Sequence, residues 1–233
     1  ETFQAVMAKN RHERKSTFLA LPFHKVVAIS VVLKQGDDLK VWSIGDEQTA
    51  EKELIQRFYS GIERFHPTLV SWNGTGFDLP VMHYRGLKHS IVAGEYWDTG
   101  HSNPQLKYNN YLNRYHEKHT DLMDLIALYN PRASAKLDQV ALMLGYPGKM
   151  GMSGDKVYAA FKAGQIGEIR NYCETDVLNT YLVFLRFQVM RGILSPQGQM
   201  EEEHNLKDYL SKERIQRPHL GQFLDAMETS SIE

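Results

Sequence analysis

The sequence predicts an α/β fold, in which strands alternate with helices around a shared core. Two short, continuous apolar segments have the pattern of buried strands, and amphipathic segments of helical period lie between and after them. The composition is that of an ordinary globular protein, because 42% of the 233 residues are hydrophobic and 24% are charged. A chain of this length can bury a core as one large domain or two small ones.

The first half of the chain predicts five elements before residue 73. The run at 26–33 is apolar and β-branched, which suits a strand covered on both faces. The helix at 47–65 repeats apolar residues at helical spacing and is stopped by Pro67. In order, we predict a helix at 3–15, strands at 26–33 and 40–44 on either side of a turn at 36–38, a helix at 47–65 and a strand at 68–72.

The second half predicts mainly helices joined by loops. In order, we predict a helix from about Asp78, a loop-rich stretch at 94–118, a helix or strand–helix corner at 121–129, a helix at 136–144 followed by Gly145, a glycine-punctuated loop at 148–154 and a long helix at 165–191 stopped by Gly192. Beyond Pro196 the chain is polar and carries no clear motif.

The composition excludes several classes of protein. No segment approaches the ~20 apolar residues of a membrane span, and no secretory leader is evident, so we expect no membrane association. The one cysteine, Cys173, excludes a disulfide scaffold and a multi-cysteine zinc site, and it favours a reducing compartment, the cytoplasm. The net charge of −1 means that nucleic-acid binding would depend on local patches or metal ions.

The segment 70–78 places polar side chains directly after a predicted strand. The strand ends at Trp72, a Gly-rich loop follows, and the pair Phe77 and Asp78 opens the next helix. In α/β sheets, ligands bind beyond the carboxyl ends of strands, at loops of this kind. Asp78 would then face a ligand, and Asn73 would hydrogen-bond beside it. The alternative is structural, with Asn73 as a turn residue and Asp78 as a helix cap.

A second polar pair lies inside the predicted long helix. Tyr172 and Asp176 are four residues apart and therefore share one face of that helix. A half-buried carboxylate is costly unless it is paired or bound to a metal ion. The apolar stripe beside the pair consists of Ile169, Cys173, Val177 and Phe184, in which Cys173 is interpreted as a small core residue.

Together, the two segments resemble the second and third exonuclease motifs of the DEDD superfamily. Asn73, Phe77 and Asp78 match the second motif, and Tyr172 and Asp176 match the third. The tyrosine marks the subclass that includes the proofreading domains of family B DNA polymerases. The chain is similar to stand-alone predicted exonucleases related to those domains over about 20–190. Further similarity lies at HTDLMD (119–124), KLD (136–138), LGYPGK (144–149) and YCETDVLNTY (172–181).

The resemblance implies a ribonuclease H-like mixed sheet flanked by helices, in a single exonuclease domain over 1–233. Within this domain, 24–192 would be the core and 193–233 a polar C-terminal segment. The family's first motif, an Asp-x-Glu on the first strand, is not found in this sequence. We therefore expect that strand to be missing from the chain, with 1–23 as an insert that follows it. The alternative is a degenerate copy that has lost the motif.

The resemblance also implies a chemistry. Hydrolysis of phosphodiesters by two divalent ions needs clustered carboxylates, which Mg²⁺ and Mn²⁺ prefer as ligands. Asp78 and Asp176 would bind the two ions, and the Tyr172 hydroxyl would orient the attacking water. The expected activity is that of a 3′–5′ exonuclease on single-stranded DNA, releasing 5′-mononucleotides. An exoribonuclease and a non-catalytic nucleic-acid-binding module are the alternatives.

Other residues are candidates for substrate contact, alongside Asn73 and Phe77. The stretch 107–118, which contains Tyr108 and Arg114, interleaves aromatic and basic residues. This pattern fits a single strand that stacks on rings beside a phosphate-tracking groove, or a helix whose tyrosines pack inward. Lys149 would contact a phosphate from its Gly-rich loop, or belong to a plain connection. Protein partners are not predicted.

Two polar clusters are interpreted as structural. The basic residues at 9–15 fit a solvated helix end better than a phosphate contact. His116 and His119 with Asp121 have poor spacing for a metal site, so we expect Asp121 and Asp124 to be caps or structural acceptors.

Overall fold

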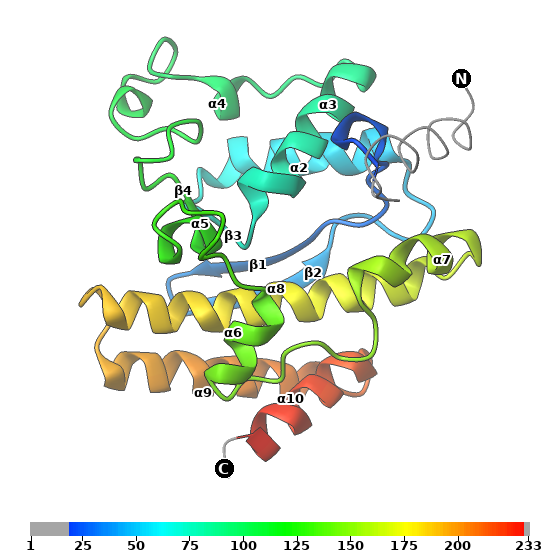
Figure 1. The fold of residues 1–233 in the computed structure, drawn as a ribbon, viewed down its shortest axis with the longest axis vertical. Helices are drawn as coiled ribbons and strands as arrows, with labels where there is room; N and C mark the ends of the chain where they lie inside the picture. The colour runs from blue at the N-terminus through cyan, green and yellow to red at the C-terminus, as the bar shows by residue number, and fades with distance from the viewer. Residues whose placement is uncertain (1–18, 231–233) are drawn as a thin grey trace.

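The computed structural model describes residues 19–230 of the chain (Figure 1). The predicted helix at 3–15, with its basic residues at 9–15, lies outside the described residues. Across residues 19–230, no helix combines the length and the apolar composition that crossing a bilayer requires.

An antiparallel hairpin comes first among the strands. Strand β1 (Ser30–Gln35) pairs with β2 (Asp38–Ser43) in a register that sets Ser30 opposite Ser43. Gly36 supplies the positive φ of +57° in the turn between them, a conformation that favours glycine. Both strands were predicted, with the turn in its observed place.

The predicted bounds of the first strand were wrong at its start. Residues 26–29 precede β1 and are not part of it. The backbone N–H of Val26 donates to the Glu51 carboxylate at 2.8 Å, a group that comes from another element of the fold. A single sequence gives no signal for such a long-range contact.

Helix α2 (Glu51–Phe65) also begins later than predicted. A hydrogen-bonded turn occupies the residues before it, in which the Thr49 hydroxyl donates to the Asp46 carboxylate at 2.8 Å. The same carboxylate accepts the N–H of Gln48 at 2.9 Å. Short polar side chains compete in this way with helical backbone bonds.

A second pair of strands is parallel. Strand β3 (Leu69–Ser71) pairs with β4 (His119–Asp121), and Ser71 lies opposite Asp121. Helix α5 (Leu122–Ile126) follows β4 directly, which confirms the predicted strand–helix corner. The carboxyl ends of both strands therefore lie at one edge, where side chains from distant parts of the chain can meet.

The other helical elements before residue 166 are short. The α-helices are α3 (Leu79–His89), α4 (Gly94–Trp97), α6 (Leu137–Met143) and α7 (Val157–Lys162). The 3-10 helices are η1 (Leu21–Phe23), η3 (Pro104–Lys107) and η4 (Gly154–Lys156), and η2 (Gly74–Asp78) is a π-helical turn.

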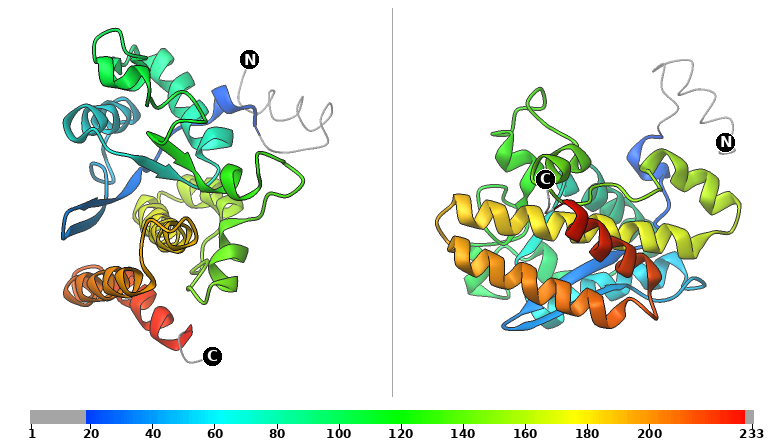
Figure 2. Two further views of the ribbon diagram at one scale, coloured as in Figure 1. Left: turned by 90° about the vertical axis from the view of Figure 1, so that its left-hand side faces the viewer. Right: turned by 90° about the horizontal axis from the view of Figure 1, so that it is seen from below.

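The long helix α8 (Ile166–Met190) packs against both strand pairs. Figure 2 shows the strands between α8 on one side and the pair α2 and α3 on the other. One hydrophobic core joins β2, α6 and α8, and a second joins α2 and α3 to the segment before β1. Within the described part of the chain the two strand pairs share no hydrogen-bonded ladder, so α8 holds them together. The predicted α/β class, with mixed strand pairing and flanking helices, is confirmed.

Glycines follow two helices where the sequence predicted them. Gly145, after α6, has a φ of +77°, and Gly192, after α8, has a φ of +73°. A left-handed residue after the last turn ends an α-helix, and glycine adopts it without steric cost.

The segment 193–233 was predicted to be polar and without a motif, and no helix was predicted in it. It contains two helices, α9 (Pro196–Glu213) and α10 (Pro218–Ser230), each with proline in its first turn. Their apolar residues are few but spaced at helical period, and they complete the core under α8. Those buried are Leu206, Leu210, Leu220, Phe223, Leu224 and Met227.

Candidate active site

Asp78 lies beyond the carboxyl end of β3. It is the last residue of the turn η2 and directly precedes α3, and its side chain is exposed to solvent. Asn73, at the start of this loop, has a φ of +60°, and its backbone carbonyl accepts the N–H groups of Gly76 and Phe77 at 3.2 and 3.0 Å. The loop therefore turns tightly enough to bring Asp78 back to the strand edge.

Two glycines are sterically required in this loop. A Cβ atom at Gly74 would lie 2.3 Å from the Ser71 hydroxyl oxygen. A Cβ atom at Gly76 would lie 2.3 Å from the Asn73 side-chain oxygen. Asn73 thus folds its amide over Gly76 within the loop, and any larger residue would displace it.

Asp121, at the carboxyl end of β4, fixes the same loop from the neighbouring strand. Its carboxylate accepts the backbone N–H groups of Asn73 and Thr75, each at 2.9 Å. It also accepts the Thr75 hydroxyl at 2.6 Å, and the Asp124 carboxylate lies 2.8 Å from that hydroxyl. The prediction that Asp121 and Asp124 are structural acceptors agrees with these contacts, which tie α5 and β4 to the loop that carries Asp78.

Tyr172 and Asp176 lie on α8, and a side-chain hydrogen-bond interaction between them acts to raise the pKa of Tyr172 and to lower that of Asp176. Their spacing of one helical turn makes this contact possible, as the sequence predicted. Desolvation by burial, followed by the negative charge of Asp176, raises the pKa of Tyr172 far above its ordinary value. Tyr172 therefore keeps its proton at neutral pH and acts as a hydrogen-bond donor.

The carboxyls of Asp78 and Asp176 come from distant parts of the chain and lie close enough for the charge of Asp176 to raise the pKa of Asp78. Burial is the main cause that raises the pKa of Asp176 to about 6. The pKa of Asp78 is also raised to about 6, first by desolvation and then by the charges of Asp121 and Asp176. Because Asp78 keeps an exposed surface, solvent screens part of this effect. Carboxylates that repel one another in this way are a favourable place for a cation.

These two carboxylates fit a divalent cation as a pair rather than as a complete cage. Mg²⁺ is commonly held by one or two carboxylates, with water and substrate phosphates completing its coordination. Within residues 19–230, no cluster of three or more His, Cys, Asp or Glu side chains has the arrangement of a metal site. Asp78 and Asp176 are the candidate ligands, and they do not by themselves form such a cluster.

Lys149 lies near this pair, because its charge lowers the pKa of Asp176, although burial outweighs it. The backbone of its loop is clamped. The Lys149 N–H donates to Asp138 at 2.7 Å, and the Asn179 side-chain amide donates to the Gly148 carbonyl at 2.8 Å. The Lys149 side chain itself is exposed and free to meet a ligand.

The other predicted substrate contacts lie in three different places. Phe77 belongs to the Asp78 loop, but its ring packs edge-on against His24 at 5.1 Å and is partly buried. Tyr108 has a ring that is 76% exposed and lies 5.4 Å from the Lys107 ammonium. The described part of the chain shows no hydrogen bond or ring contact between Tyr108 and the carboxylates. Arg114 lies among aromatic rings close to Asp124, as described below.

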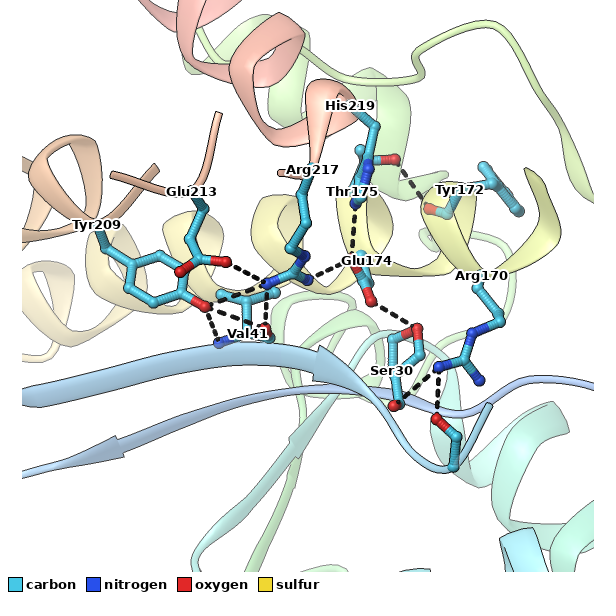
Figure 3. Close-up of polar contacts among 12 residues, drawn as sticks. Ser30, Val41, Arg170, Tyr172, Glu174, Thr175, Tyr209, Glu213, Arg217 and His219 are labelled. Atoms are coloured by element: carbon cyan, nitrogen blue, oxygen red, sulfur yellow. Dashed lines mark hydrogen bonds and ion pairs between the residues drawn. The ribbon is translucent and has the colours of Figure 1, made fainter. Parts of the chain in front are cut away.

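Glu174, between Tyr172 and Asp176, is a residue that sequence reasoning missed (Figure 3). It lies on another face of α8 and is buried, and it accepts the Ser43 hydroxyl at 2.7 Å. Its second oxygen is hydrogen-bonded to the Arg217 guanidinium and lies 2.6 Å from a ring nitrogen of His219. These bonds outweigh the desolvation of Glu174 and lower its pKa to about 2.

Arg170 adds a second tether one turn earlier on α8. Its guanidinium donates to the backbone carbonyls of Ser43, Ile44 and Gly45 at 3.1, 3.1 and 2.7 Å. Together, Arg170 and Glu174 fasten to β2 the turns of α8 that carry Tyr172 and Asp176. In the sequence, Arg170 and Glu174 are only two charged residues four positions apart in a predicted helix. This pattern is too common to identify a tethering role.

Comparison with known proteins agrees with this arrangement. A family model described as "Predicted 3'-5' exonuclease related to the exonuclease domain of PolB" matches residues 16–227. A DNA polymerase of Archaeoglobus fulgidus is 25% identical over 161 residues, which are 68% of this chain and 19% of the polymerase. The chain thus spans about a fifth of the length of that relative. Because the family match covers most of the sequence, the chain belongs to the family of predicted 3′–5′ exonucleases related to the exonuclease domain of PolB.

Proposed function

We propose that the chain is a divalent-metal-dependent 3′–5′ exonuclease that releases 5′-mononucleotides from single-stranded DNA. The observation that supports the proposal is the electrostatic proximity of Asp78 to Asp176, with Tyr172 one helical turn from Asp176 on α8. Family membership supports a nuclease with a nucleic-acid substrate. We also place the protein in the cytoplasm, because its single cysteine fits a reducing compartment.

Asp78 and Asp176 would hold Mg²⁺ or Mn²⁺. Such ions would polarise the phosphate, generate a nucleophile from water at neutral pH and stabilise the charge on the leaving oxygen. In the family that the chain resembles, an Asp-x-Glu motif supplies further carboxylates. This sequence does not contain that motif.

The chain's own residues have separable tasks in this proposal. Tyr172, which retains its proton, positions the attacking water by hydrogen bonding. Lys149 binds a non-bridging phosphate oxygen, since its exposed ammonium lies near Asp176. A water oxygen then bonds to phosphorus and loses a proton to solvent, while the P–O3′ bond breaks and the leaving O3′ gains a proton from solvent. The products are a 5′-mononucleotide and a strand with a free 3′ hydroxyl.

The test is hydrolysis of 5′-labelled single-stranded DNA by the protein expressed from its complete natural reading frame. With Mg²⁺ or Mn²⁺, we expect a ladder of 3′-shortened products that EDTA abolishes. Asp176→Asn should lower the rate at least about 100-fold, because it removes a charged metal ligand. Asp225→Asn, at an exposed site on α10, is the matched control and should cleave normally.

An intact strand after incubation with wild-type protein, despite measurable binding, would overturn the proposal in favour of a non-catalytic module. A matched RNA oligonucleotide is run beside the DNA. Faster trimming of the RNA would replace single-stranded DNA by RNA as the substrate. The two nucleic acids differ at the 2′-hydroxyl, which a protein can read directly.

A further inference from the structure

Arg114, Tyr115 and Tyr129 form a compact, solvent-facing cluster, which we call the aromatic platform. The Arg114 guanidinium carbon lies 5.3 Å from the centre of the Tyr115 ring and 5.0 Å from that of Tyr129. The two rings meet edge to face with their centres 5.9 Å apart. Tyr115 is 73% exposed, so one aromatic residue is left open to solvent beside a guanidinium.

Tyr129 is held rigidly at two points. Its backbone N–H donates to the Asp124 carbonyl at 2.7 Å, and its hydroxyl donates to the Arg114 carbonyl at 2.8 Å. Leu128 and Tyr129 both have left-handed backbones, with φ of +50° and +58°. Consecutive non-glycine residues in this conformation are strained, and such strain is concentrated at functional sites. The platform is therefore pre-organised, so that binding would lose little conformational entropy.

The platform lies beside the proposed active site. Asp124 bonds to Tyr129 through its backbone, and its carboxylate lies 2.8 Å from the hydroxyl of Thr75 in the loop that ends at Asp78. Desolvation raises the pKa of Tyr129, and the negative charges of Asp124 and Asp121 act in the same direction. One residue thus links the aromatic rings to the loop that carries a metal-binding carboxylate.

We propose that the aromatic platform binds a base of a single-stranded nucleic acid, upstream of the scissile phosphate. The base stacks on Tyr115, and Arg114 contacts the adjoining phosphate. This inference rests on the proposed nuclease function and extends it to the path of the strand. Every base has a π face, so stacking of this kind is tolerant of sequence, and a duplex with its bases already stacked is disfavoured.

The chain contains a matched control for the platform. Arg64 and Phe65, at the end of α2, form a cation–π pair with a separation of 5.1 Å, and Phe65 is 40% exposed. This pair precedes β3, whereas the carboxylates follow the carboxyl ends of β3 and β4. Substitutions there remove an arginine or a ring without touching the proposed strand path.

The test is fluorescence anisotropy with a labelled single-stranded DNA of about 16 nucleotides, in EDTA to stop hydrolysis. Tyr115→Ala should weaken binding about 5- to 100-fold, as expected for loss of one stacked base. Tyr115→Phe keeps the ring and should bind like wild type. Phe65→Ala should also leave the affinity unchanged.

A second probe with the same phosphates and abasic sugars isolates stacking from charge. Wild type should bind the abasic strand more weakly, and Tyr115→Ala should show no further loss on it. Arg114→Gln should reduce the slope of log affinity against log salt concentration by about one, as expected for the loss of one phosphate contact. Arg64→Gln should leave this slope unchanged. Wild-type affinity in Tyr115→Ala, or an equal loss on both probes, would overturn the proposal.

Kinetics separate this inference from the proposed function. Tyr115→Ala should raise KM for the strand and keep kcat, because the ring is not at the reacting atoms. If Tyr115→Ala hydrolyses the strand with an unchanged KM, the platform proposal is rejected and the nuclease proposal stands. If the wild-type protein binds the strand through Tyr115 but never cleaves it, the platform proposal stands and the nuclease proposal is rejected.

Discussion

The carboxylate of Asp121 binds Thr75 twice, accepting its backbone N–H at 2.9 Å and its hydroxyl at 2.6 Å. Because Thr75 lies in the loop that ends at Asp78, this contact sets the position of that carboxyl. Asp121→Asn keeps one acceptor oxygen and replaces the other by an NH2 group, so the side chain loses either the bond from the Asn73 N–H or the two bonds from Thr75. We expect the exonuclease rate to fall about 10- to 100-fold, the usual effect of removing a group that orients a metal ligand.

Asp98→Asn is the control for this prediction. Asp98 is also buried and also accepts several backbone N–H groups, including those of Gly100 and Asn103 at 2.9 and 2.6 Å. Its hydrogen bonds go to the backbone of residues 100–103, away from the loop that carries Asp78. Thermal unfolding should register the loss of backbone bonds in both variants, while only Asp121→Asn should slow cleavage. Equal cleavage rates in the two variants would show that Asp121 does not position the site.

Glu174→Gln should destabilise the protein at neutral pH. The pKa of Glu174 is lowered to about 2 in the folded state, so its contribution is present above the unfolded value of 4.5 and is lost as pH falls toward 2. We expect a loss of about 3 kcal/mol at pH 7, measured by urea unfolding. The difference from wild type should shrink at pH 3. Asp225→Asn, which breaks an exposed ion pair, should cost less than about 1 kcal/mol.

Asp176→Asn should stabilise the metal-free protein at pH 7.5. The pKa of Asp176 is raised to about 6 in the folded state, so the group favours folding below its unfolded value of 3.8, and this advantage is lost as pH rises through 6. After allowance for partial exposure, we expect a gain of about 1–2 kcal/mol at pH 7.5 and none at pH 4. Added Mg²⁺ should raise the melting temperature of wild type but not that of the variant. A lower melting temperature for the variant at pH 7.5 would contradict the prediction.

Leu128→Gly should raise the melting temperature. Leu128 is 84% exposed and has a φ of +50°, so glycine relieves strain and loses little packing. We expect a gain of about 1 kcal/mol, or about 2–4 °C for a domain of this size. The matched change Leu87→Gly, at a 79% exposed position inside α3, should instead cost about 1 kcal/mol. Scanning calorimetry distinguishes the two signs.

Local signals in the sequence were sufficient for part of this structure. The end of α8 followed from Gly192, and the shared face of Tyr172 and Asp176 followed from their spacing. The loop that carries Asp78 followed from glycines after a buried strand. Each of these features depends on a few neighbouring residues.

Features that depend on distant residues were missed. The backbone N–H of Val26 bonds to Glu51 in another element, and the role of Asp121 depends on its register opposite Ser71. The stripe predicted along α8 was also incomplete, since Leu178 and Leu182 are the residues buried completely against α9 and α10. The helices of 193–233 were missed because their few apolar residues are diluted by charged ones.

The contact between Glu174 and the C-terminal helices has a consequence for where this protein can be shortened. A chain cut after α8 would retain both carboxylates, Tyr172 and Lys149, and would look intact by inspection of its motifs. Such a chain would nevertheless lack Arg217 and His219, the hydrogen-bond partners of the buried Glu174, and would expose the apolar side of α8. The shortest fragment that contains Asp78, Lys149, Tyr172 and Asp176 is therefore shorter than the shortest fragment that can hold these residues in position.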